Sequence, residues 1–363
     1  MQLDFHYYAT YCAAYLAGYS HEESLDICYS AQFVDHCSKT LLRKIKAPVA
    51  AATTQLQLEL MDARTDVPGL QDITRIWAAF HFLPADLHAS CRGGRRYKSK
   101  YRLICGPNGP LAARTVKLAK GGSLQAAGLA MHVIADTWAH RYFAGTPSLV
   151  INNTNYYFYE ILEEDGAPSE RRVMFRHNPG APDDPEEGKY TNSVMQNSES
   201  SIMNLGHGRA GHLPDYSFIK YRYLPAWGDY EEIVKDNPSD YMHAFAQMVY
   251  ALRWLRGDTA AGEFRTDAYD SARVAPHIKT IREILVRRQI DASADWKAFA
   301  EQLSGREIED FALGKYQEEY RNAPKDGKSS TFLGRFIEAA LLQKRMVTEE
   351  ISAAGIKLAG KWR

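Results

Sequence analysis

Histidine and aspartate side chains, which often hold divalent metal ions in proteins, recur in short clusters along the first 220 positions. Eleven of the twelve histidines lie before residue 244, and several stand beside an acid or one helical turn from it. Imidazole and carboxylate groups suit zinc and similar ions. The clusters therefore predict a site for several divalent ions, with zinc as the leading candidate, formed by His6, Asp35, His81, His132, Asp136, His140, His207, His212 and Asp215.

The segment with the strongest helical pattern, SLQAAGLAMHVIADTWAHRYF from residue 123, carries three of these residues. Each residue of an α-helix turns about 100°, so His132, Asp136 and His140 drift only about 40° from one to the next and share one face. The rest of the segment is apolar, so this face points to solvent or to an interior site. In the simpler alternative, both histidines bond to Asp136 within the core. The other clusters favour metal, which would offset the cost of burying charge.

The remaining clusters are weaker when taken singly. His6 in DFHYY and His81 in WAAFHFLP stand among aromatic and apolar residues, where an ordinary core histidine is the competing interpretation. Asp35 ends a predicted amphipathic helix, where the helix dipole disfavours an acid that has no specific partner. GHGRAGHLPD at 206–215 combines glycines, which permit close backbone approach, with a proline that fixes the turn. This composition is typical of a ligand loop.

A basic stretch, CRGGRRYKSKYR at 91–102, is the second feature with chemical potential. If it borders the metal site, Arg95, Arg96 and Lys98 would hold a phosphate group through charge-assisted hydrogen bonds. The alternative is a solvated basic hairpin. Nothing in the stretch specifies nucleic acid.

Helical periodicity and capping signals predict the elements that must position these residues. Ser20 followed by Glu23 is a capping-box pattern that predicts the start of a helix. Pro84 is expected to end the helix predicted over residues 71–82. The run TTQLQLELMD after Pro48 alternates polar and apolar side chains and predicts a short strand, paired with 97–105. We expect helices over residues 3–18, 20–37, 71–82, 123–145, 194–206, 239–256, 274–289, 306–322 and 330–357.

The predicted fold is mainly α, a multi-helix bundle with the metal site between helices and a short β-hairpin near residues 52–105. A core domain over residues 1–260 would carry the chemistry. Residues 261–363 would form a C-terminal helical extension packed on this core, and its charged helices would offer a surface to a partner protein. The segment NPGAPDDPEEGKYTN at 178–192 is rich in proline, glycine and acids and is predicted as a loop or lid.

Composition places the chain among ordinary globular proteins. The 44 Lys and Arg residues balance the 44 Asp and Glu residues, so no global charge would draw the molecule to nucleic acid or anionic lipid. No apolar stretch approaches the roughly 18 residues of a membrane span. The N-terminal segment lacks the features of a secretory signal, and the five cysteines include no C-x-x-C pair. We therefore expect a cytoplasmic protein, with export by a specialised system as the alternative.

The order of these residues resembles the zinc-dependent phospholipase C and single-strand-specific nuclease superfamily. The shared pattern is an N-terminal helix with a His, then an Asp, a His, an H-x-x-x-D helix followed by a His, and last a His with an acid. It covers about residues 1–220 of this chain. The chain also resembles a bacterial family of uncharacterised proteins that begins with D-F-H-Y-Y and carries an A-D-T-W-x-H helix. This second resemblance is closer and implies no known activity.

The first resemblance implies a ligand set for about two or three zinc ions. The ligands of one ion would be Asp35, His81, His132 and Asp136, with Asp136 bridging to a neighbouring ion. The ligands of the second would be His140, Asp215 and either His207 or His212. His6 would help to hold a third ion, for which the superfamily also uses the amino group of a processed N-terminal residue.

The chain departs from the superfamily pattern at several points. Its first residue is Met1 rather than the superfamily's Trp, and we expect no signal to be removed. His140 follows Asp136 by four positions where the superfamily has six, and the last His and acid are not spaced as H-x-x-x-E or H-x-x-x-D. These departures bear most on the third ion, for which Asp4 is an alternative ligand.

Together these inferences predict a metal-dependent phosphoesterase acting on a phosphate-containing small molecule or a lipid headgroup. Bound ions would polarise the phosphoryl oxygens and lower the pKa of a bridging water. Asp35 would orient that water, and Asp136 would bridge the ions. The alternatives are a metal-dependent hydrolase that cleaves an amide and a non-catalytic protein whose metals hold its helices together. A third alternative is an effector delivered into another cell.

Overall fold

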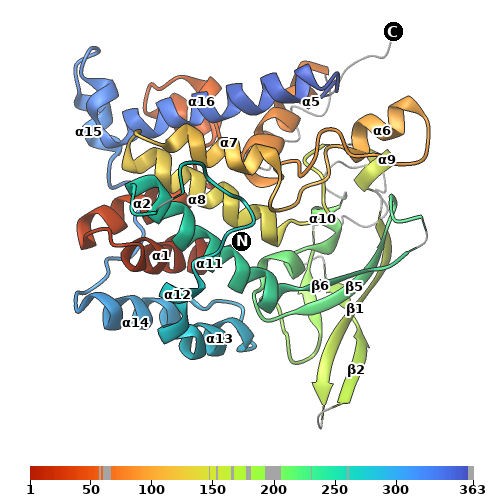
Figure 1. Cartoon of the computed structure of the whole chain (residues 1–363). Helices are drawn as coiled ribbons and strands as arrows, with labels where there is room; N and C mark the ends of the chain where they lie inside the picture. Colours follow the sequence, from red (N-terminus) through yellow and green to blue (C-terminus); the bar gives the residue numbers. More distant parts are fainter. Residues whose placement is uncertain are drawn as a thin grey trace.

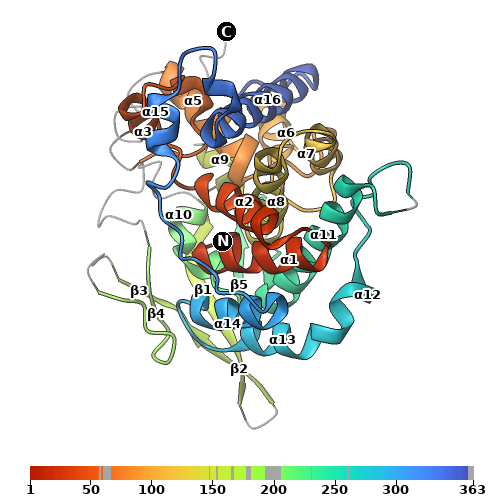
Figure 2. The ribbon, with the colours of Figure 1, turned by 90° about the vertical axis from the view of Figure 1, so that its left-hand side faces the viewer.

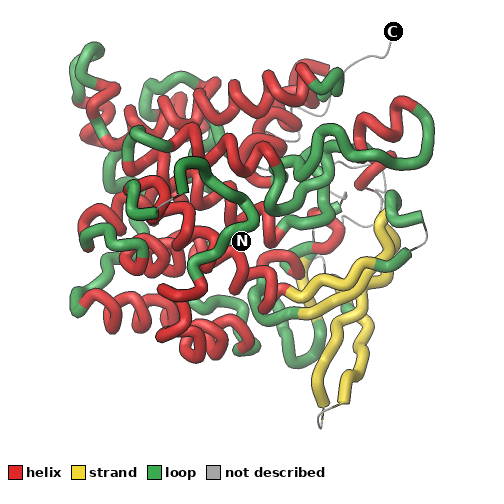
Figure 3. Tube along the Cα trace, in the orientation of Figure 1, coloured by secondary structure: helices red, strands yellow, loops and turns green. Residues whose placement is uncertain are grey.

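A computed structural model shows a body of packed helices with a small sheet at one side (Figures 1 and 3). It describes residues 1–56, 59, 67–146, 148–152, 154–164, 167–176, 181–192, 206–229, 231–259 and 261–358. Helices make up most of these residues. The mainly α prediction is confirmed, whereas the sheet lies in a part of the chain where no strand was expected.

The chain begins with a helical hairpin, as predicted. Its first arm joins a π-helical segment, η1 (Asp4–Ala9), to α1 (Thr10–Leu16), and its second arm is α2 (His21–Phe33). The Ser20 hydroxyl accepts from the Glu23 backbone N–H, and the Glu23 carboxylate accepts from the Ser20 N–H. This capping box fixes where α2 begins.

Helix α8 (Leu124–Ala139) is the centre of the helical body. The Ser123 hydroxyl accepts from the Ala126 N–H and begins the helix as predicted, but the helix ends at His140 rather than near Gly145. Nearly every residue of α8 is buried, so all of its faces need partners. These partners are α2, α7 (Pro110–Ala119), α11 (Asn237–Arg256) and α16 (Phe332–Ala353). Figure 2 shows α2 beside α8.

Gly128 lets α2 cross α8 closely. A Cβ atom at this position would lie 2.2 Å from the carbonyl oxygen of Ile27, so no larger residue fits without moving a helix. The crossing matters for the site because the chain passes directly from α2 to Asp35, while α8 carries His132 and Asp136.

The C-terminal helices pack into the same hydrophobic core as the first helices. The predictions for 274–289 and 330–357 are confirmed, but α14 (Ser293–Ser304) was not predicted, and only α15 is helical within 306–322. A domain boundary near residue 260 stays a prediction. The other helical elements of this part are α12 (Ser271–Val274), η6 (Ala275–His277), α13 (Ile278–Val286), α15 (Gln317–Asn322) and η7 (Lys328–Ser330).

Antiparallel strands form the sheet in the order β2-β1-β5-β6. In its register, Tyr159 of β1 lies between Arg172 of β2 and Arg222 of β5. A second hydrophobic cluster packs against the sheet, and in it Phe143, just past the end of α8, stacks on Tyr223. The strands are β1 (Thr154–Glu164), β2 (Ala167–Arg172), β5 (Lys220–Pro225) and β6 (Ile233–Asp236).

The segment predicted as a loop or lid is a turn followed by a short strand. Residues 178–180 lie outside the described part of the chain. The rest turns and then forms β4 (Lys189–Thr191), which pairs in parallel with β3 (Met174–Arg176). The Pro185 carbonyl accepts from Arg171 and Arg288, so the turn is tied to both the sheet and the chain after α13. The helix expected at 194–206 falls outside the described residues except for position 206.

The hairpin expected near residues 52–105 is wrong for the residues that the structure describes. Residues Arg95–Tyr101 form a helix, α6, and no strand is found at 53–56; positions 57, 58 and 60–62 are not described. Seven residues are too few for alternation to separate a strand from a helix. Here the chain instead makes isolated bridges, from Pro84 to Cys105 and from Ile104 to Ala144.

The predicted helix at 71–82 is confirmed, and it has an unusual end. Its first part is α5 (Val67–Ile76), and its last part is a second π-helical segment, η3 (Trp77–His81). The remaining short elements are α3 (Lys39–Lys44), η2 (Val49–Ala51), α9 (Leu149–Asn152), α10 (His207–Ala210) and η5 (Leu213–Asp215). No helix among the described residues combines the length and apolar character needed to cross a bilayer.

Candidate metal centre

Asp136 is the centre of the candidate site. Its side chain is only 1 % exposed, and both carboxylate oxygens face nitrogen atoms. Oδ1 lies 3.0 Å from the Met1 amine and 3.2 Å from Nε2 of His6. Oδ2 lies 3.1 Å from Nδ1 of His81 and 3.2 Å from Nε2 of His132. One buried carboxylate thus joins groups from the N-terminus, η3 and α8.

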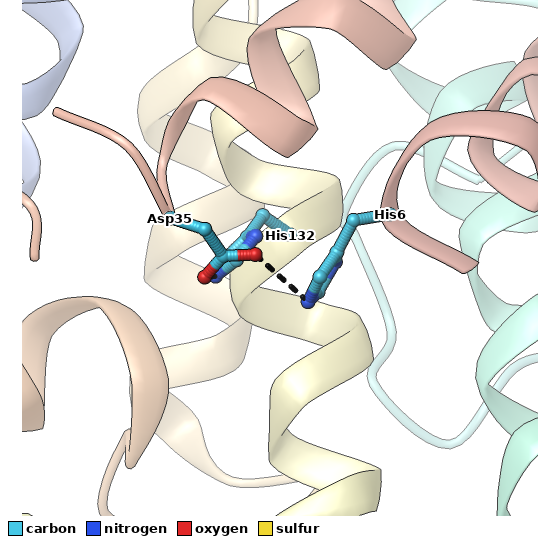
Figure 4. A group of neighbouring side chains, drawn as sticks. All are labelled: His6, Asp35 and His132. Carbon is cyan, nitrogen blue, oxygen red and sulfur yellow. Dashed lines mark ion pairs between the residues drawn. The ribbon is translucent and has the colours of Figure 1, made fainter. Parts of the chain in front are cut away.

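His6, Asp35 and His132 form the first of three groups with the spacing of metal ligands (Figure 4). The rings of His6 and His132 stack with centroids 3.9 Å apart. Asp35, in the turn after α2, places Oδ2 4.0 Å from Nε2 of His6 and Oδ1 3.9 Å from Nε2 of His132. The close crossing of α2 and α8 is what brings Asp35 to these rings.

His81, His132 and Asp136 form the second group. Nδ1 of His81 lies 3.3 Å from Nε2 of His132 and 3.8 Å from Oδ1 of Asp35. His81 is the last residue of η3, just as His6 belongs to η1, so both π-helical segments deliver a histidine to the site. Single π-helical turns are rare in proteins and are frequently found at functional sites.

His140, His207 and Asp215 form the third group. Oδ1 of Asp215 lies 3.2 Å from Nε2 of His140, and its Oδ2 lies 3.4 Å from Nε2 of His207. Gly206, which precedes His207, has φ 52° and ψ −111°, a conformation that side chains rarely allow. The ligand loop expected here therefore depends on a glycine to turn His207 towards the site.

The amine of Met1 is the only ammonium group within this cluster among the described residues. It is fully buried and lies 3.0 Å from oxygens of both Asp136 and Asp215 and 3.4 Å from Nε2 of His140. Burial would lower its pKa, but the carboxylates of Asp136, Asp215 and Asp35 raise it to about 11. Three carboxylates thus share one ammonium. Burial opposes charge on His81 as well, but its hydrogen bond to Asp136 raises its pKa above 6.5, so this imidazole also contributes positive charge.

Backbone carbonyls orient two of the imidazoles. Nε2 of His81 donates to the Thr53 carbonyl at 2.9 Å, so its Nδ1 faces Asp136. Nδ1 of His140 donates to the carbonyl of His81 at 2.6 Å, so its Nε2 faces Asp215. Hydrogen bonds of this kind fix the tautomer and ring orientation of metal-binding histidines.

The protonation states favour a cation in this space. Burial lowers the pKa of His6, His132 and His140 to about 4, so these rings are neutral at pH 7. Although burial opposes charge on Asp136, His140 and the Met1 amine hold the pKa of this carboxyl well below 3.8. Neutral imidazoles and ionised carboxylates are the forms that bind metal.

Several nitrogen atoms of the cluster are left without hydrogen bonds among the described residues. They are buried, and they are Nδ1 and Nε2 of His6, Nδ1 of His132 and Nε2 of His207. A buried polar atom without a partner is costly. Those that face the carboxylates, such as Nε2 of His6, would be satisfied by an ion bound between them.

The distances also suit zinc. Two ligand atoms that are each about 2.0–2.1 Å from a tetrahedral zinc ion lie about 3.3 Å apart. In each group the ligand atoms lie within 4.8 Å of one another, and the closest nitrogen–oxygen pairs in the second and third groups are 3.1 and 3.2 Å apart. The spacing of the residues present is therefore compatible with divalent ions, most closely in the second and third groups.

Two ligand residues of the cluster are partly exposed to solvent. His6 and His132 are fully buried, whereas Asp35 is 29 % exposed and His207 is 21 % exposed. A catalytic metal site must keep a coordination position for water or substrate, whereas a structural site is closed. The partial exposure of Asp35 and of His207 is compatible with such a position in the first and third groups.

Two of the predicted metal ligands lie elsewhere. Nδ1 of His212 lies 2.9 Å from Oδ2 of Asp183, and its ring makes no ion pair with the cluster among the described residues. Asp4, the alternative ligand for a third ion, accepts instead from the backbone N–H groups of Phe5 and Ala292. Its burial raises its pKa to about 6, and the Met1 amine takes the place expected for it.

The structure does not join the predicted phosphate-binding residues to the cluster. Arg95 and Lys98 are exposed on α6, and no hydrogen bond or ion pair connects them to a ligand residue within the described part of the chain. The side chain of Arg96 lies outside the described part. Phosphate binding by this stretch stays a prediction.

Sequence reasoning missed two features of the site. The Met1 amine is a backbone group, so a search among side chains could not find it; only the resemblance pointed to an amino group there. The Thr53 carbonyl that orients His81 is likewise invisible in the sequence.

The comparison with known families places this chain in a group without an assigned activity. No curated protein and no solved structure matches it. A family model matches residues 1–351, which include every residue of the cluster. The chain therefore belongs to DUF6765, a family of unknown function.

Proposed function

We propose that this protein is a metal-dependent phosphoesterase, with zinc as the most suitable metal. One observation carries the proposal: three groups of His and Asp side chains meet around one buried carboxylate, and burial lowers the pKa of three of their imidazoles to about 4. The order of these ligands along the chain, and an amine beside the cluster, resemble the zinc-dependent phospholipase C and nuclease superfamily.

Each group would hold one ion. The ligands of the first would be His6, Asp35 and His132, with the Met1 amine nearby; those of the second, His81, His132 and Asp136; those of the third, His140, His207 and Asp215. Because a neutral imidazole offers a single lone pair, His132 would serve either the first ion or the second, and Asp136 is the residue that neighbouring ions could share. Bound ions supply Lewis acidity towards phosphoryl oxygens and a nucleophilic water near neutral pH.

Asp35 would orient the attacking water. It is the most exposed carboxylate of the cluster, at 29 %, and its two oxygens face different histidines. A partly exposed acceptor can hold a water by hydrogen bonding and receive its proton. Asp136 has no such freedom, because both of its oxygens are already enclosed.

Elemental analysis of the purified chain tests the metal part of the proposal. We expect about two or three equivalents of zinc or a similar ion in the wild type and a loss of most of this metal in His132→Ala and Asp136→Asn. His243→Ala, which removes an exposed histidine outside the cluster, is the matched control. Metal-free wild-type protein that stays folded after zinc is added would contradict the proposal.

Hydrolysis assays test the reaction. We expect the zinc-loaded chain to cleave bis(p-nitrophenyl) phosphate, and Asp35→Asn to lower kcat by about a hundredfold while keeping the zinc held by the groups without Asp35. Cleavage of a p-nitroanilide instead would replace the phosphoesterase by an amide hydrolase. Metal binding without either activity would make the ions structural.

A further inference from the structure

A second hollow lies across α8 from the candidate metal centre. Its volume is about 390 Å³, which is within the range of small-molecule sites. Asp136 and His140 face the metal cluster, whereas Trp138 and Arg141 line this hollow, as the turn of a helix requires. We call it the α8 pocket; the lining residues that matter here are Asp86, Tyr101, Asn108, Arg141, Tyr142 and Trp227.

Aromatic rings form the walls of the α8 pocket. Tyr101, Tyr142 and Trp227 are each only partly buried. Trp227 meets Tyr101 edge-on with ring centroids 6.0 Å apart, and the Tyr142 ring lies 6.1 Å from Trp227 at an interplanar angle of 38°. Partly exposed rings that converge on one hollow favour a planar guest, because stacked aromatic rings gain more than contact area alone supplies.

Arg141 gives the pocket a positive charge that its contacts with Tyr142 and Asp240 engage only in part. Its guanidinium lies 4.6 Å from the ring centroid of Tyr142 and only 3.5 Å from Oδ1 of Asp240. Asp240 is already paired with the buried amine of Lys235, so its charge is matched without Arg141. With 37 % of its side chain exposed, Arg141 keeps donors free for an anion within the described structure.

The backbone of the pocket is held in a strained form. Tyr142 has φ 78° and Asn108 has φ 64°, and both line the pocket. A bulky residue rarely adopts this conformation, and it persists where neighbours enforce it. The N–H of Tyr142 donates to the Cys105 carbonyl, and its own carbonyl accepts from Nε1 of Trp227 at 3.2 Å. These bonds set the Tyr142 ring against the hollow.

We propose that the α8 pocket binds a small planar aromatic anion, with its ring against Tyr142 and Trp227 and its acidic group on Arg141. Asp86 is an exposed lining residue whose Oδ1 accepts from the His88 N–H, and its carboxylate favours a heterocycle that carries an N–H donor. This site is separate from the metal cluster and does not depend on the function proposed above.

Isothermal titration calorimetry with matched probes tests the chemistry of the guest. Indole-3-acetate has a planar ring, an N–H and a carboxylate; tryptophol keeps the ring without the charge, and cyclohexylacetate keeps the charge without the ring. We expect the full-length chain to bind indole-3-acetate at least about tenfold more tightly than either of the others. No binding of indole-3-acetate, or equal affinity for all three probes, would overturn the proposal.

Variants locate the binding. We expect Trp227→Leu and Arg141→Met each to weaken indole-3-acetate about tenfold. Tyr157→Leu and Arg265→Met, which remove an exposed ring and an exposed guanidinium elsewhere, should bind as the wild type does. Tyr101→Leu replaces Trp227→Leu if circular dichroism shows the latter to be unfolded. Unchanged affinity for indole-3-acetate in both Arg141→Met and the aromatic variant would overturn the proposal.

Metal removal separates the two sites. We expect indole-3-acetate to bind equally well before and after dialysis against EDTA. Affinity that is lost with the metal and retained in Arg141→Met would place the probe at the cluster and overturn the proposal.

Discussion

Two buried carboxylates, Asp136 in the helical body and Glu160 in the sheet, are neutralised in opposite ways. Glu160 is fully buried and accepts from Arg171 and Arg288 at 2.7 Å each and from the Tyr190 hydroxyl at 3.3 Å. Both guanidinium groups carry a permanent charge. Glu160 therefore needs nothing further and joins the sheet to the chain after α13.

Asp136 has more neighbours but less charge. Three of the imidazoles around it have pKa values lowered to about 4 by burial, and the Met1 amine is shared with Asp215. The contrast shows how a structural carboxylate differs from a metal ligand. Arginine neutralises the charge of the structural carboxylate, whereas a neutral histidine does not neutralise the carboxylate beside it, so a cation can still bind there.

Metal removal should have the largest effect, and it should act through the site of Asp136 and not through Glu160. At free zinc a thousandfold above its Kd, binding contributes about 4 kcal/mol to the folded state. We expect EDTA to lower the Tm of the wild type, and zinc to restore it, in thermal unfolding followed by circular dichroism. Asp136→Asn should not respond to zinc. An equal zinc response in this variant would remove Asp136 from the site.

Glu160→Gln should destabilise the fold without affecting metal. Breaking a buried ion pair costs about 3–5 kcal/mol, and we expect about 3 because Arg171 and Arg288 are 28 % and 29 % exposed. Urea unfolding measures the loss, and elemental analysis should find the wild-type metal content. Glu170→Gln, which touches the exposed pair with Arg222, is the control and should change stability little. A loss of zinc in Glu160→Gln would erase the contrast between the two carboxylates.

Gly128→Ala should loosen the site from a distance. A methyl group 2.2 Å from the Ile27 carbonyl forces α2 away from α8, at a cost of about 2 kcal/mol. Because α2 leads to Asp35, the zinc affinity should fall as well, as measured by competition with a chromophoric chelator. Gly262→Ala is the control, since a Cβ there meets nothing within 4 Å. If Gly128→Ala were as stable as the wild type, α2 and α8 could move apart at no cost, and the prediction would be wrong.

The smallest expected effect on stability concerns the ion pair of His212 and Asp183, which lies outside the metal cluster. The hydrogen bond to Asp183 raises the pKa of His212 above 6.5; burial opposes charge on Asp183, but its bonds to His212, Tyr216 and Thr191 lower its pKa below 3.8. His212 therefore stabilises the fold below about pH 6.5 and loses this effect as pH rises through its raised pKa. Asp183 stabilises it above about pH 3.8 and loses this effect as pH falls through its lowered pKa.

The pair thus stabilises most between these two limits, by less than about 1 kcal/mol because solvent screens the half-exposed imidazole. We expect His212→Ala to be less stable than the wild type near pH 5 and nearly equal above pH 8, in urea unfolding at each pH, with an unchanged zinc content. Loss of zinc in His212→Ala would return this residue to the cluster.

The helical part of the fold was predictable because its signals are local. Ser123 and the four-residue spacing of His132, Asp136 and His140 lie within one helix, and the Ser20 capping box spans only four residues. The His and Asp residue types, together with their clustering, were then sufficient to select most of the candidate ligands. Helix packing brought them together without any further signal in the sequence.

The sheet and the fate of His212 were not predictable in this way. Strand β1 pairs with β5, whose residues lie more than fifty positions away, and such non-local pairing leaves little trace in either segment. His207 and His212 are equivalent by type and neighbourhood. Gly211, with φ 59°, turns the chain between them, and the partner of His212 comes from a segment predicted as a loop.

The two π-helical segments make the site sensitive to the length of the chain as well as to its side chains. Each winds an extra residue into its turn, and each ends or begins beside a ligand histidine. Deleting one residue from η3 would restore ordinary winding and leave a sound helix, yet it would rotate His81 by about 100° relative to α5. A relative in this family that lacks one residue in either segment would therefore be expected to keep the fold and to lose the metal site.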